Sequence, residues 1–289
     1  MDINPEEFTI RFWGVRGSIP CPGPETLWYG GNTPCVEMRV GGKLLIFDGG
    51  TGLRMLGRSL SAQAPITAYL FFSHLHWDHI QGLPFFEPAF RKGNTLFLYG
   101  RVGDSTGLLD QYLIGQMQDP HFPIPMAEMK ADLRFVAVNP GTPISFDDII
   151  VRTASLNHPG GAIGYRVEWR GRSAAYVTDT EHYADRLDAR VLELARNADV
   201  LIYDAMYTDE EYNAGRKGWG HSTWQEAVKM ARTAEARRLV LFHHDPAHDD
   251  AFLSEIRIQA KIEFANCFVA REGQSMAIVR PRPSVSGTP

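Results

Sequence analysis

The chain contains 289 residues, and 44% of them are hydrophobic, which is enough to bury a large core. The net charge of −5 and the lack of a visible basic patch argue against a protein that grips long nucleic acid. No apolar stretch is long enough to span a bilayer, and the acidic residues 1–7 do not resemble a secretory signal.

Domain organisation and compartment follow from the same survey. Three widely spaced cysteines, Cys21, Cys35 and Cys267, form neither a zinc knuckle nor a disulfide framework, which fits a reducing, cytoplasmic location. We expect one domain over residues 1–280 and a disordered tail over residues 281–289. A homodimer is compatible with the sequence, which contains no motif that tests it.

The first part of the chain is rich in strand patterns. Strands are expected over residues 8–13, 35–40, 43–47, 68–73 and 95–99, and helices over 53–60, 80–86 and 108–118. The Gly41-Gly42 pair predicts a hairpin turn between the second and third strands. Residues 117–126 are rich in Pro and Met, and Met117, Phe122, Ile124 and Met126 are expected to form a lip over a pocket.

The turn that follows strand 68–73 contains four potential metal ligands within six residues. His74 and His76 alternate in a way that aims both at one point, whereas Asp78 and His79 suit a second, neighbouring ion. Mixed nitrogen and carboxylate ligands favour zinc, with manganese and iron as alternatives. This cluster predicts a hydrolase with two divalent metal ions.

The second part of the chain repeats the strand-rich pattern. Strands are expected over residues 148–153, 162–169, 173–178, 200–203, 239–242 and 275–280, and helices over 186–196, 222–234 and 249–261. Two strand-rich halves with helices predict an α/β protein in which two sheets pack face to face and helices cover them outside.

Further polar residues stand where these later strands end. His158, Asp179, Asp204 and His243 each follow or close a predicted strand. One such residue alone is more often an ordinary loop residue, but the recurrence at four strand ends adds to the ligand turn at 74–79. We therefore expect these residues to complete the metal site.

The ordered set His74-x-His76-x-Asp78-His79, then His158, Asp179 and His243, resembles the metallo-β-lactamase superfamily over residues 8–280. The resemblance implies a four-layer αβ/βα sandwich with a dinuclear site at one edge of the two sheets. It also implies that His74, His76 and His158 bind one metal, that Asp78, His79 and His243 bind the other, and that Asp179 bridges both. Asp48, at the end of strand 43–47, is expected to support the ligand turn rather than to bind metal.

The chemistry of such a site is hydrolytic. A water held between two cations loses a proton near neutral pH, and the resulting metal-bound hydroxide is the nucleophile, which Asp78 could orient. Asp179 stands where the best-known zinc β-lactamases carry cysteine, which argues against antibiotic hydrolysis. His76 and Asp78 depart from the flavodiiron pattern, which argues against oxygen or nitric oxide reduction.

The segment Gly218-Trp-Gly-His221-Ser-Thr223 resembles that of ribonuclease Z and related phosphodiesterases. The resemblance implies that His221 donates a proton to the leaving oxygen and that Asp204 assists it. A phosphodiester needs this donor because an alkoxide is a poor leaving group. The alternative role of the segment is to begin a helix, with Ser222 and Thr223 near its cap and Glu226 placed for a capping box.

The substrate class is inferred from residues 100–132. This segment has Arg101 and Lys130 as its basic residues against five acidic ones, so it would repel a polyanion; the acids are Asp104, Asp110, Asp119, Glu128 and Asp132. A small phosphodiester, such as a cyclic nucleotide or cyclic sugar phosphate, is therefore favoured. The alternatives are a ribonuclease Z-like nuclease, a lactonase or thioesterase, and a nucleotide-binding sensor without turnover.

For a last set of residues, the sequence allows either contact with the substrate or an ordinary structural role. Arg16 and Asn32 lie in Gly-rich loops and could meet a phosphate oxygen, although tight turns alone explain those glycines. His121 could contact substrate from the lip, and Glu181 and His182 could face the pocket after Asp179. His244, Asp245 and His248 are candidates for support of the ligands or for a plain loop.

Overall fold

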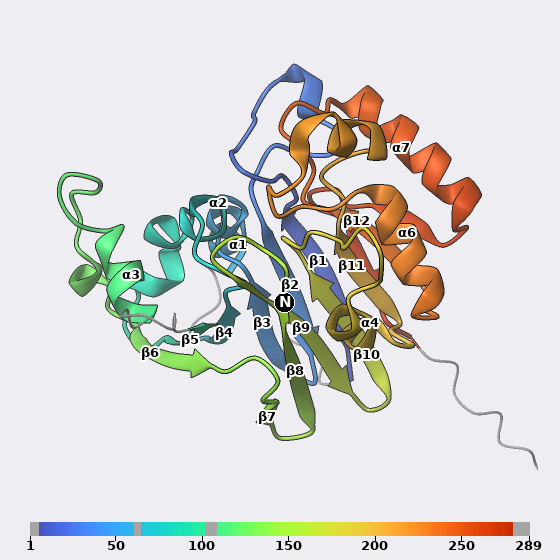
Figure 1. Ribbon diagram of the computed structural model, residues 1–289. Coiled ribbons are helices and arrows are strands. Elements are labelled where there is room, and N and C mark those ends of the chain that lie inside the picture. The colour runs from blue at the N-terminus through green and yellow to red at the C-terminus, as the bar shows by residue number, and fades with distance from the viewer. Residues whose placement is uncertain (1–5, 61–64, 102–108, 280–289) are drawn as a thin grey trace, which may run out of the picture.

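The computed structural model describes residues 6–60, 65–101 and 109–279 (Figure 1). The predicted tail over residues 281–289 and residue Asp104 lie outside these ranges. Within the described ranges, no helix combines the length and apolar character needed to cross a membrane.

Among the described residues, the first seven-stranded sheet has the order β14-β1-β2-β3-β4-β5-β6. Its strands are β1 (Phe8–Gly14), β2 (Cys35–Val40), β3 (Lys43–Phe47), β4 (Thr67–Phe71), β5 (Thr95–Arg101), β6 (Asp132–Val138) and β14 (Ser275–Ala277). Its helices and 3₁₀ turns are η1 (Pro24–Thr26), α1 (Gly52–Leu60), α2 (Trp77–Ile80), η2 (Leu83–Phe85), η3 (Glu87–Phe90), α3 (Leu109–Gly115) and η4 (Met126–Glu128). Strands β3 to β6 run parallel, and β14, β1, β2 and β3 pair antiparallel.

The second sheet of the described chain also has seven strands, in the order β13-β12-β11-β10-β9-β8-β7. Its strands are β7 (Ile144–Phe146), β8 (Ile149–Leu156), β9 (Ala162–Trp169), β10 (Arg172–Val177), β11 (Val200–Asp204), β12 (Leu239–Phe242) and β13 (Cys267–Val269). The helices are α4 (Ala189–Ala195), α5 (Asp209–Glu211), η5 (Tyr212–Arg216), α6 (Trp224–Thr233) and α7 (Asp250–Glu263). Strands β10 to β13 are parallel, and β7 to β10 are antiparallel.

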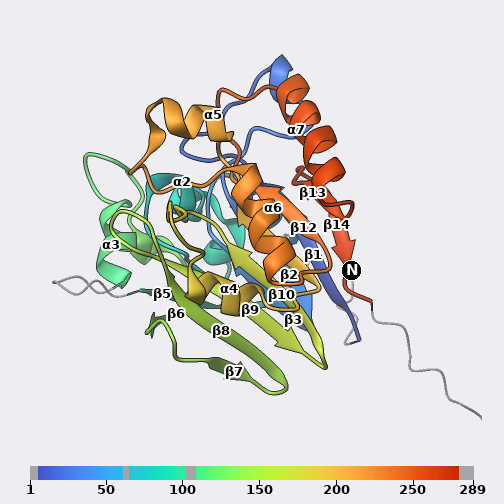
Figure 2. The ribbon, with the colours of Figure 1, turned by 45° about the vertical axis from the view of Figure 1, so that its right-hand side comes forward.

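Three apolar layers hold the molecule together. The central layer joins the inner faces of both sheets and contains aromatic residues such as Phe47, Phe71 and Tyr165. A second layer lies under α4, α6 and α7 on the outer face of one sheet, and a third lies under α1 and α3 on the other (Figures 1 and 2). The predicted four-layer αβ/βα sandwich is confirmed.

Several predicted elements differ in detail. The helix expected over residues 80–86 is wrong: α2 is already formed at Trp77, and η2 follows as a 3₁₀ turn after Gly82. A Cβ on Gly82 would collide with the carbonyl of Gly50, so this position serves close packing rather than a helix. Strands β6, β7 and β13 were not predicted, since β6 and β7 are poorly buried and β7 and β13 have three residues each.

Strand direction places the predicted ligands at one edge. Strands β3 and β4 end side by side, and so do the parallel strands β10, β11 and β12. Strand β8 has the same direction as β10, because both pair antiparallel with β9. The loops after all these carboxyl ends therefore carry the polar residues of the site.

Candidate metal centre

The structure brings all seven predicted metal ligands into one cluster at the ends of the strands. We call this cluster the candidate metal centre; it consists of His74, His76, Asp78, His79, His158, Asp179 and His243. Three groups within it have ligand atoms that all lie within 4.8 Å of one another: His74, His76 and His158; Asp78, His79 and His243; and His74, His79 and Asp179. The first two correspond to the two predicted ligand triads, and the third joins them through Asp179.

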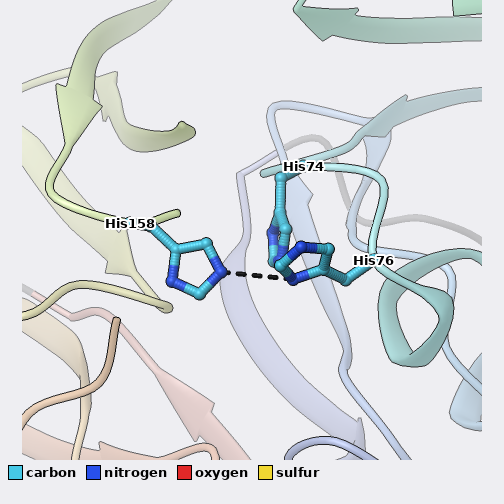
Figure 3. Close-up of side chains that lie close together, drawn as sticks. All are labelled: His74, His76 and His158. Atoms are coloured by element: carbon cyan, nitrogen blue, oxygen red, sulfur yellow. Dashed lines mark hydrogen bonds between the residues drawn. The ribbon is translucent and has the colours of Figure 1, made fainter. Parts of the chain in front are cut away.

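The first group contains three imidazoles (Figure 3). His158 Nε2 lies 3.2 Å from His76 Nδ1, while His158 Nδ1 lies 2.9 Å from the carbonyl of Gly220 and donates to it. Nδ1 of His74 lies 3.0 Å from Ser73 Oγ, and its buried Nε2 has no hydrogen-bond partner among the described residues. A buried nitrogen without a partner is costly, and a cation in front of it would remove this cost.

The second group has the spacing of a tetrahedral site. His79 Nε2 lies 3.2 Å from both Asp78 Oδ2 and His243 Nε2, and 3.3 Å from Asp179 Oδ2. His243 Nε2 lies 3.3 Å from each of the two carboxylate oxygens. Ligands at roughly 2.0–2.1 Å from a tetrahedral zinc ion are about 3.3 Å apart, so these atoms fit such an ion.

Asp179 connects the two groups through its separate oxygens. Oδ1 lies 3.6 Å from His74 Nε2 and 3.9 Å from His158 Nε2, whereas Oδ2 faces His79 and His243. Thr178 donates a hydrogen bond of 2.6 Å to Oδ2. The two oxygens of Asp179 therefore face different groups, and the bridging role that the resemblance implies stays a prediction.

The imidazoles of the first group favour their neutral form. Burial, with the adjacent His79, lowers the pKa of His74 well below its ordinary value. Burial also lowers the pKa of His76 and the pKa of His158. Neutral imidazoles present lone pairs, which is the form that binds a metal ion.

The carboxylates around the second group are stabilised by a positive charge. Burial opposes the charge on Asp179, but His243 and His79 outweigh it and hold the pKa of this carboxyl well below its usual range. Burial likewise opposes a charged His79, yet Asp78 and Asp179 raise the pKa of this imidazole well above its ordinary value. A divalent cation between these groups supplies the charge that the two carboxylates require.

Asp48 supports the ligand turn, as the sequence predicted. Its buried Oδ2 lies 2.9 Å from His79 Nδ1 and accepts hydrogen bonds of 2.8 Å from Ser73 Oγ and Tyr176 Oη. Donation from Nδ1 leaves Nε2 of His79 with its lone pair directed at the site.

The loop after β1 supplies support that the sequence did not reveal. The backbone N–H of Ser18 donates to Asp78 Oδ2 at 2.7 Å, and Ser18 adopts a positive φ of 63°. A Cβ on Gly17 would lie 2.5 Å from the ring of His243. The glycine therefore lets the loop approach the metal ligands, and the Gly-Ser pair was the signal that could have suggested it.

Two residues that were candidates for contact with a phosphate make hydrogen bonds to other loops. The fully buried Arg16 guanidinium donates to the carbonyls of Gly30, Asp245 and His248. The side chain of Asn32 donates to Glu272 at 2.9 Å. Both residues fasten loops together, so the tight-turn explanation applies and the phosphate role is wrong for their present geometry.

His221 and Asp204 form a buried pair next to the candidate metal centre. His221 Nδ1 lies 2.9 Å from Asp204 Oδ2 and 3.9 Å from Asp179 Oδ1. Burial opposes a charged imidazole, but Asp204 outweighs it and raises the pKa of His221 to about 9. Thr223 accepts from the N–H of Glu226 and caps α6, so the segment begins a helix as expected; the proton-donor role of His221 stays a prediction.

Glu181 holds the glycine loop that carries His221. Its carboxylate accepts hydrogen bonds from the backbone N–H groups of Gly218 at 2.7 Å and Gly220 at 2.9 Å, and from Tyr212 Oη at 2.7 Å. His182 Nδ1 lies 3.0 Å from Ser222 Oγ. Neither residue belongs to the described lining of the cavity beside the candidate metal centre; both contact the loop, a role that sequence reasoning did not identify.

The loop after β12 also lacks direct ligands beyond His243. His244 Nε2 lies 3.0 Å from the carbonyl of Ala270, and burial lowers the pKa of His244 to about 3. His248 Nε2 lies 2.8 Å from Glu211 Oε1. His244 and His248 hold the loop against neighbouring segments, and so does the carbonyl of Asp245, which accepts a hydrogen bond from Arg16.

The predicted lip is largely wrong. Met117 and Met126 are buried in the outer apolar layer, and Phe122 packs against it and against Phe85. Ile124 is exposed, as is His121, and neither lines the cavity beside the candidate metal centre. That cavity is lined instead by Phe72, His74, Leu75, His76, Arg101, Tyr112, Pro159, Gly160 and Gly161.

Comparison with known proteins identifies the family and the fold of this chain. A family model described as "Beta-lactamase superfamily domain" matches residues 44–244. Ribonuclease Z of Thermoplasma acidophilum is 25% identical over an alignment that covers 91% of this chain and 94% of the relative. Two solved structures share the fold. The metallo-beta-lactamase fold protein YhfI of Bacillus subtilis has a TM-score of 0.70 and 20% identity, covering 94% of this chain and 99% of its own. A diphosphatase of the PhnP family has a TM-score of 0.68 and 21% identity, covering 93% and 97%.

The number of bound ions can be tested directly. We predict that zinc-loaded protein contains about two equivalents of metal and that His76→Ala removes about one. Asp179→Ala should remove most of both, because its carboxylate faces both groups. Metal would be measured by mass spectrometry after gel filtration, with the exposed His121→Ala as the matched control. Full metal content in Asp179→Ala would contradict the bridging assignment.

The glycine beside His243 gives a second prediction. Gly17→Ala should weaken zinc affinity roughly 10- to 100-fold, because the added methyl group displaces a ligand from its position. Affinity would be measured by competition with a chromogenic chelator. Gly115→Ala at the end of α3, where a Cβ meets nothing within 4 Å, is the control. Equal affinity in the two variants would show that His243 needs no such support.

Proposed function

This chain belongs to the beta-lactamase superfamily, and we propose that within it the protein is a dinuclear metal-dependent phosphodiesterase for small substrates. The observation that carries the proposal is the His221–Asp204 pair, 2.9 Å apart and adjacent to Asp179. A protein that only binds its ligand needs no proton donor. The need for a proton donor is also weaker for an acyl substrate than for a phosphodiester with an alkoxide leaving group.

The metal ions are assigned by the donor set. His74, His76 and His158 would hold one ion, Asp78, His79 and His243 would hold the other, and Asp179 would bridge them. The mixture of imidazole and carboxylate donors favours zinc, with manganese and iron as alternatives. When bound, two such ions neutralise the phosphoryl oxygens and activate water near neutral pH.

The protein itself supplies the proton for the leaving group. Asp204 is fully buried and also accepts from the backbone N–H groups of Thr180 and Met206, so its position is fixed. It engages Nδ1 of His221, which leaves Nε2 as the nitrogen that meets the substrate. Because Asp204 favours the charged imidazole, His221 carries the proton that the departing oxygen requires.

A small substrate is supported by the charge of the described part of residues 100–132. Glu128 pairs with Lys130, and Asp132 pairs with Arg134, so these four charges cancel locally. Asp110 and Asp119 add negative charge, and the described segment offers no cluster of cations for a long polyanion. A cyclic nucleotide or cyclic sugar phosphate needs no such cluster.

RNA processing is the second candidate. It is favoured by the similarity to the protein named ribonuclease Z from Thermoplasma acidophilum, which extends over nearly the whole chain. The His221–Asp204 pair serves either phosphodiester equally well. The two candidates therefore differ in how the substrate is bound and not in how its bond is broken.

A substrate panel on metal-analysed protein separates these functions. We expect hydrolysis of bis(4-nitrophenyl) phosphate and of a cyclic nucleotide, and no cleavage of a transfer RNA precursor, a lactone or a thioester. Cleavage of the RNA without the small diesters would establish the second candidate. Activity restricted to the lactone and thioester would overturn the phosphodiesterase proposal, and nucleotide binding without any turnover would indicate a sensor.

The pH dependence tests the proton donor. Because the pKa of His221 is raised to about 9, protonated His221 is lost as the pH rises through that value, and cyclic nucleotide hydrolysis should fall there. Asp204→Asn removes the carboxylate that raises this pKa, so the alkaline limb should move to lower pH. Bound cations lower the pKa of His221 in the wild type and in Asp204→Asn. The test is therefore the difference between the two proteins in the pH of the alkaline limb.

His221→Ala is the matching control for this profile. It should lose about 10²–10⁴-fold in kcat on the cyclic nucleotide and lack the limb, with unchanged metal content. The 4-nitrophenyl ester should be affected much less, because its leaving group departs without a proton. An identical limb in wild type and Asp204→Asn would refute the assignment.

A further inference from the structure

A second cavity lies between α7 and β13, which are neighbours in the fold (Figure 2). We call it the α7 cavity; its volume is about 180 Å³, and its lining includes the cationic residues Arg257, Lys261 and Arg271. As far as the chain is described, this lining contains no carboxylate and no residue of the candidate metal centre. The α7 cavity is therefore a cationic site separate from the one described above.

The fold brings these three cations together from two segments. Arg257 and Lys261 are four residues apart on α7, so they share one face of the helix. Arg271 stands two residues after β13, which packs beside that helix. Like charges at a spacing of four residues destabilise a helix, and an anion between them removes this repulsion. The sequence contains no continuous basic run here, so the cluster exists only in the folded chain.

Aromatic rings, rather than carboxylates, lie beside two of the cations. Cζ of Arg271 lies 4.3 Å from the centroid of the Trp28 ring, and Nζ of Lys261 lies 5.8 Å from the centroid of the Phe268 ring. An aromatic ring attracts a cation but leaves its net charge in place. Within the described residues, Arg257, Lys261 and Arg271 take part in no ion pair. Their charges are therefore held in position without a direct anionic partner.

The acidic residues next to the α7 cavity are bound to other donors. Asp250 accepts from the backbone N–H groups of Trp28 at 2.7 Å and Tyr29 at 3.0 Å. Glu272 accepts from the backbone N–H of Asn32 at 2.6 Å and from its side chain at 2.9 Å. These bonds fix the loop that carries Trp28 and keep both carboxylates away from the three cations. An anion that enters the cavity meets cationic donors in its described lining and no competing carboxylate.

We propose that the α7 cavity is an accessory binding site for a phosphate group, held by Arg257, Lys261 and Arg271. Arg binds phosphate through paired N–H groups, and Lys adds a compact positive charge. Pockets that enclose drug-sized ligands measure about 300–1,000 Å³, so the smaller α7 cavity suits a single phosphate group. The site goes beyond the proposed function, because no residue assigned to hydrolysis belongs to its described lining.

Equilibrium dialysis of zinc-loaded protein against labelled inorganic phosphate, at constant ionic strength, tests the site. Wild type should bind one equivalent of phosphate that Arg257→Gln/Lys261→Gln does not bind, and Arg271→Gln should weaken the affinity for it about 10- to 100-fold. Phosphate bound at the candidate metal centre is equal in these proteins and cancels. The matched control is Lys130→Gln/Arg134→Gln, which removes two exposed cations that pair with carboxylates elsewhere and should retain the equivalent.

The outcomes do not depend on catalysis, because inorganic phosphate is not hydrolysed. Equal phosphate binding in wild type and Arg257→Gln/Lys261→Gln would overturn the proposal. An equal loss in the control would also overturn it, since net charge alone would then explain the result. Competition with thymidine 5′-monophosphate identifies the source of the phosphate group. Displacement of the extra equivalent supports a site that accepts phosphomonoesters, and the lack of displacement supports a site for free phosphate.

Discussion

The site depends on two buried carboxylates, Asp78 and Asp179, whose oxygens face imidazole nitrogens at 3.2–3.3 Å. Such an arrangement is stable only with positive charge at its centre. The backbone is strained to create it, since Asp179 and His243 adopt positive φ angles of 51° and 62° at the ends of their strands. Conformations of this kind cost on the order of 1–3 kcal/mol each, and packing must hold them.

That packing comes from the contact between the two sheets. The ligand turn belongs to one sheet, while His158, Asp179 and His243 follow strands of the other. Tyr165 Oη donates to the carbonyl of Phe72 at 2.7 Å, and the N–H of Ile163 donates to the carbonyl of Ser73 at 2.8 Å. These bonds join the sheets directly below the ligands. The spacing of the candidate metal centre is therefore set by the central core.

Local sequence was sufficient to find the residues of the candidate metal centre and insufficient to find the residues that support them. The turn 74–79 and the strand-end residues are visible because strand period and residue type coincide within a few positions. Gly17, Ser18 and Glu181 act through contacts with residues 31 or more positions away, which no local pattern encodes. The same holds for Met117 and Met126, whose apolar character indicated burial but not whether a pocket or the core would cover them.

The geometry also separates His221 from the cavity beside the candidate metal centre. His158 lies between two different environments: its ring centroid is 5.3 Å from that of His221 and 5.0 Å from that of His76. The cavity is lined by His74 and His76, and His221 is not part of its described lining. His221 and the cavity therefore lie beside different members of the candidate metal centre. Because Glu181 fixes the loop of His221 through the backbone N–H groups of Gly218 and Gly220, the position of this imidazole is set by residues outside the described lining of the cavity.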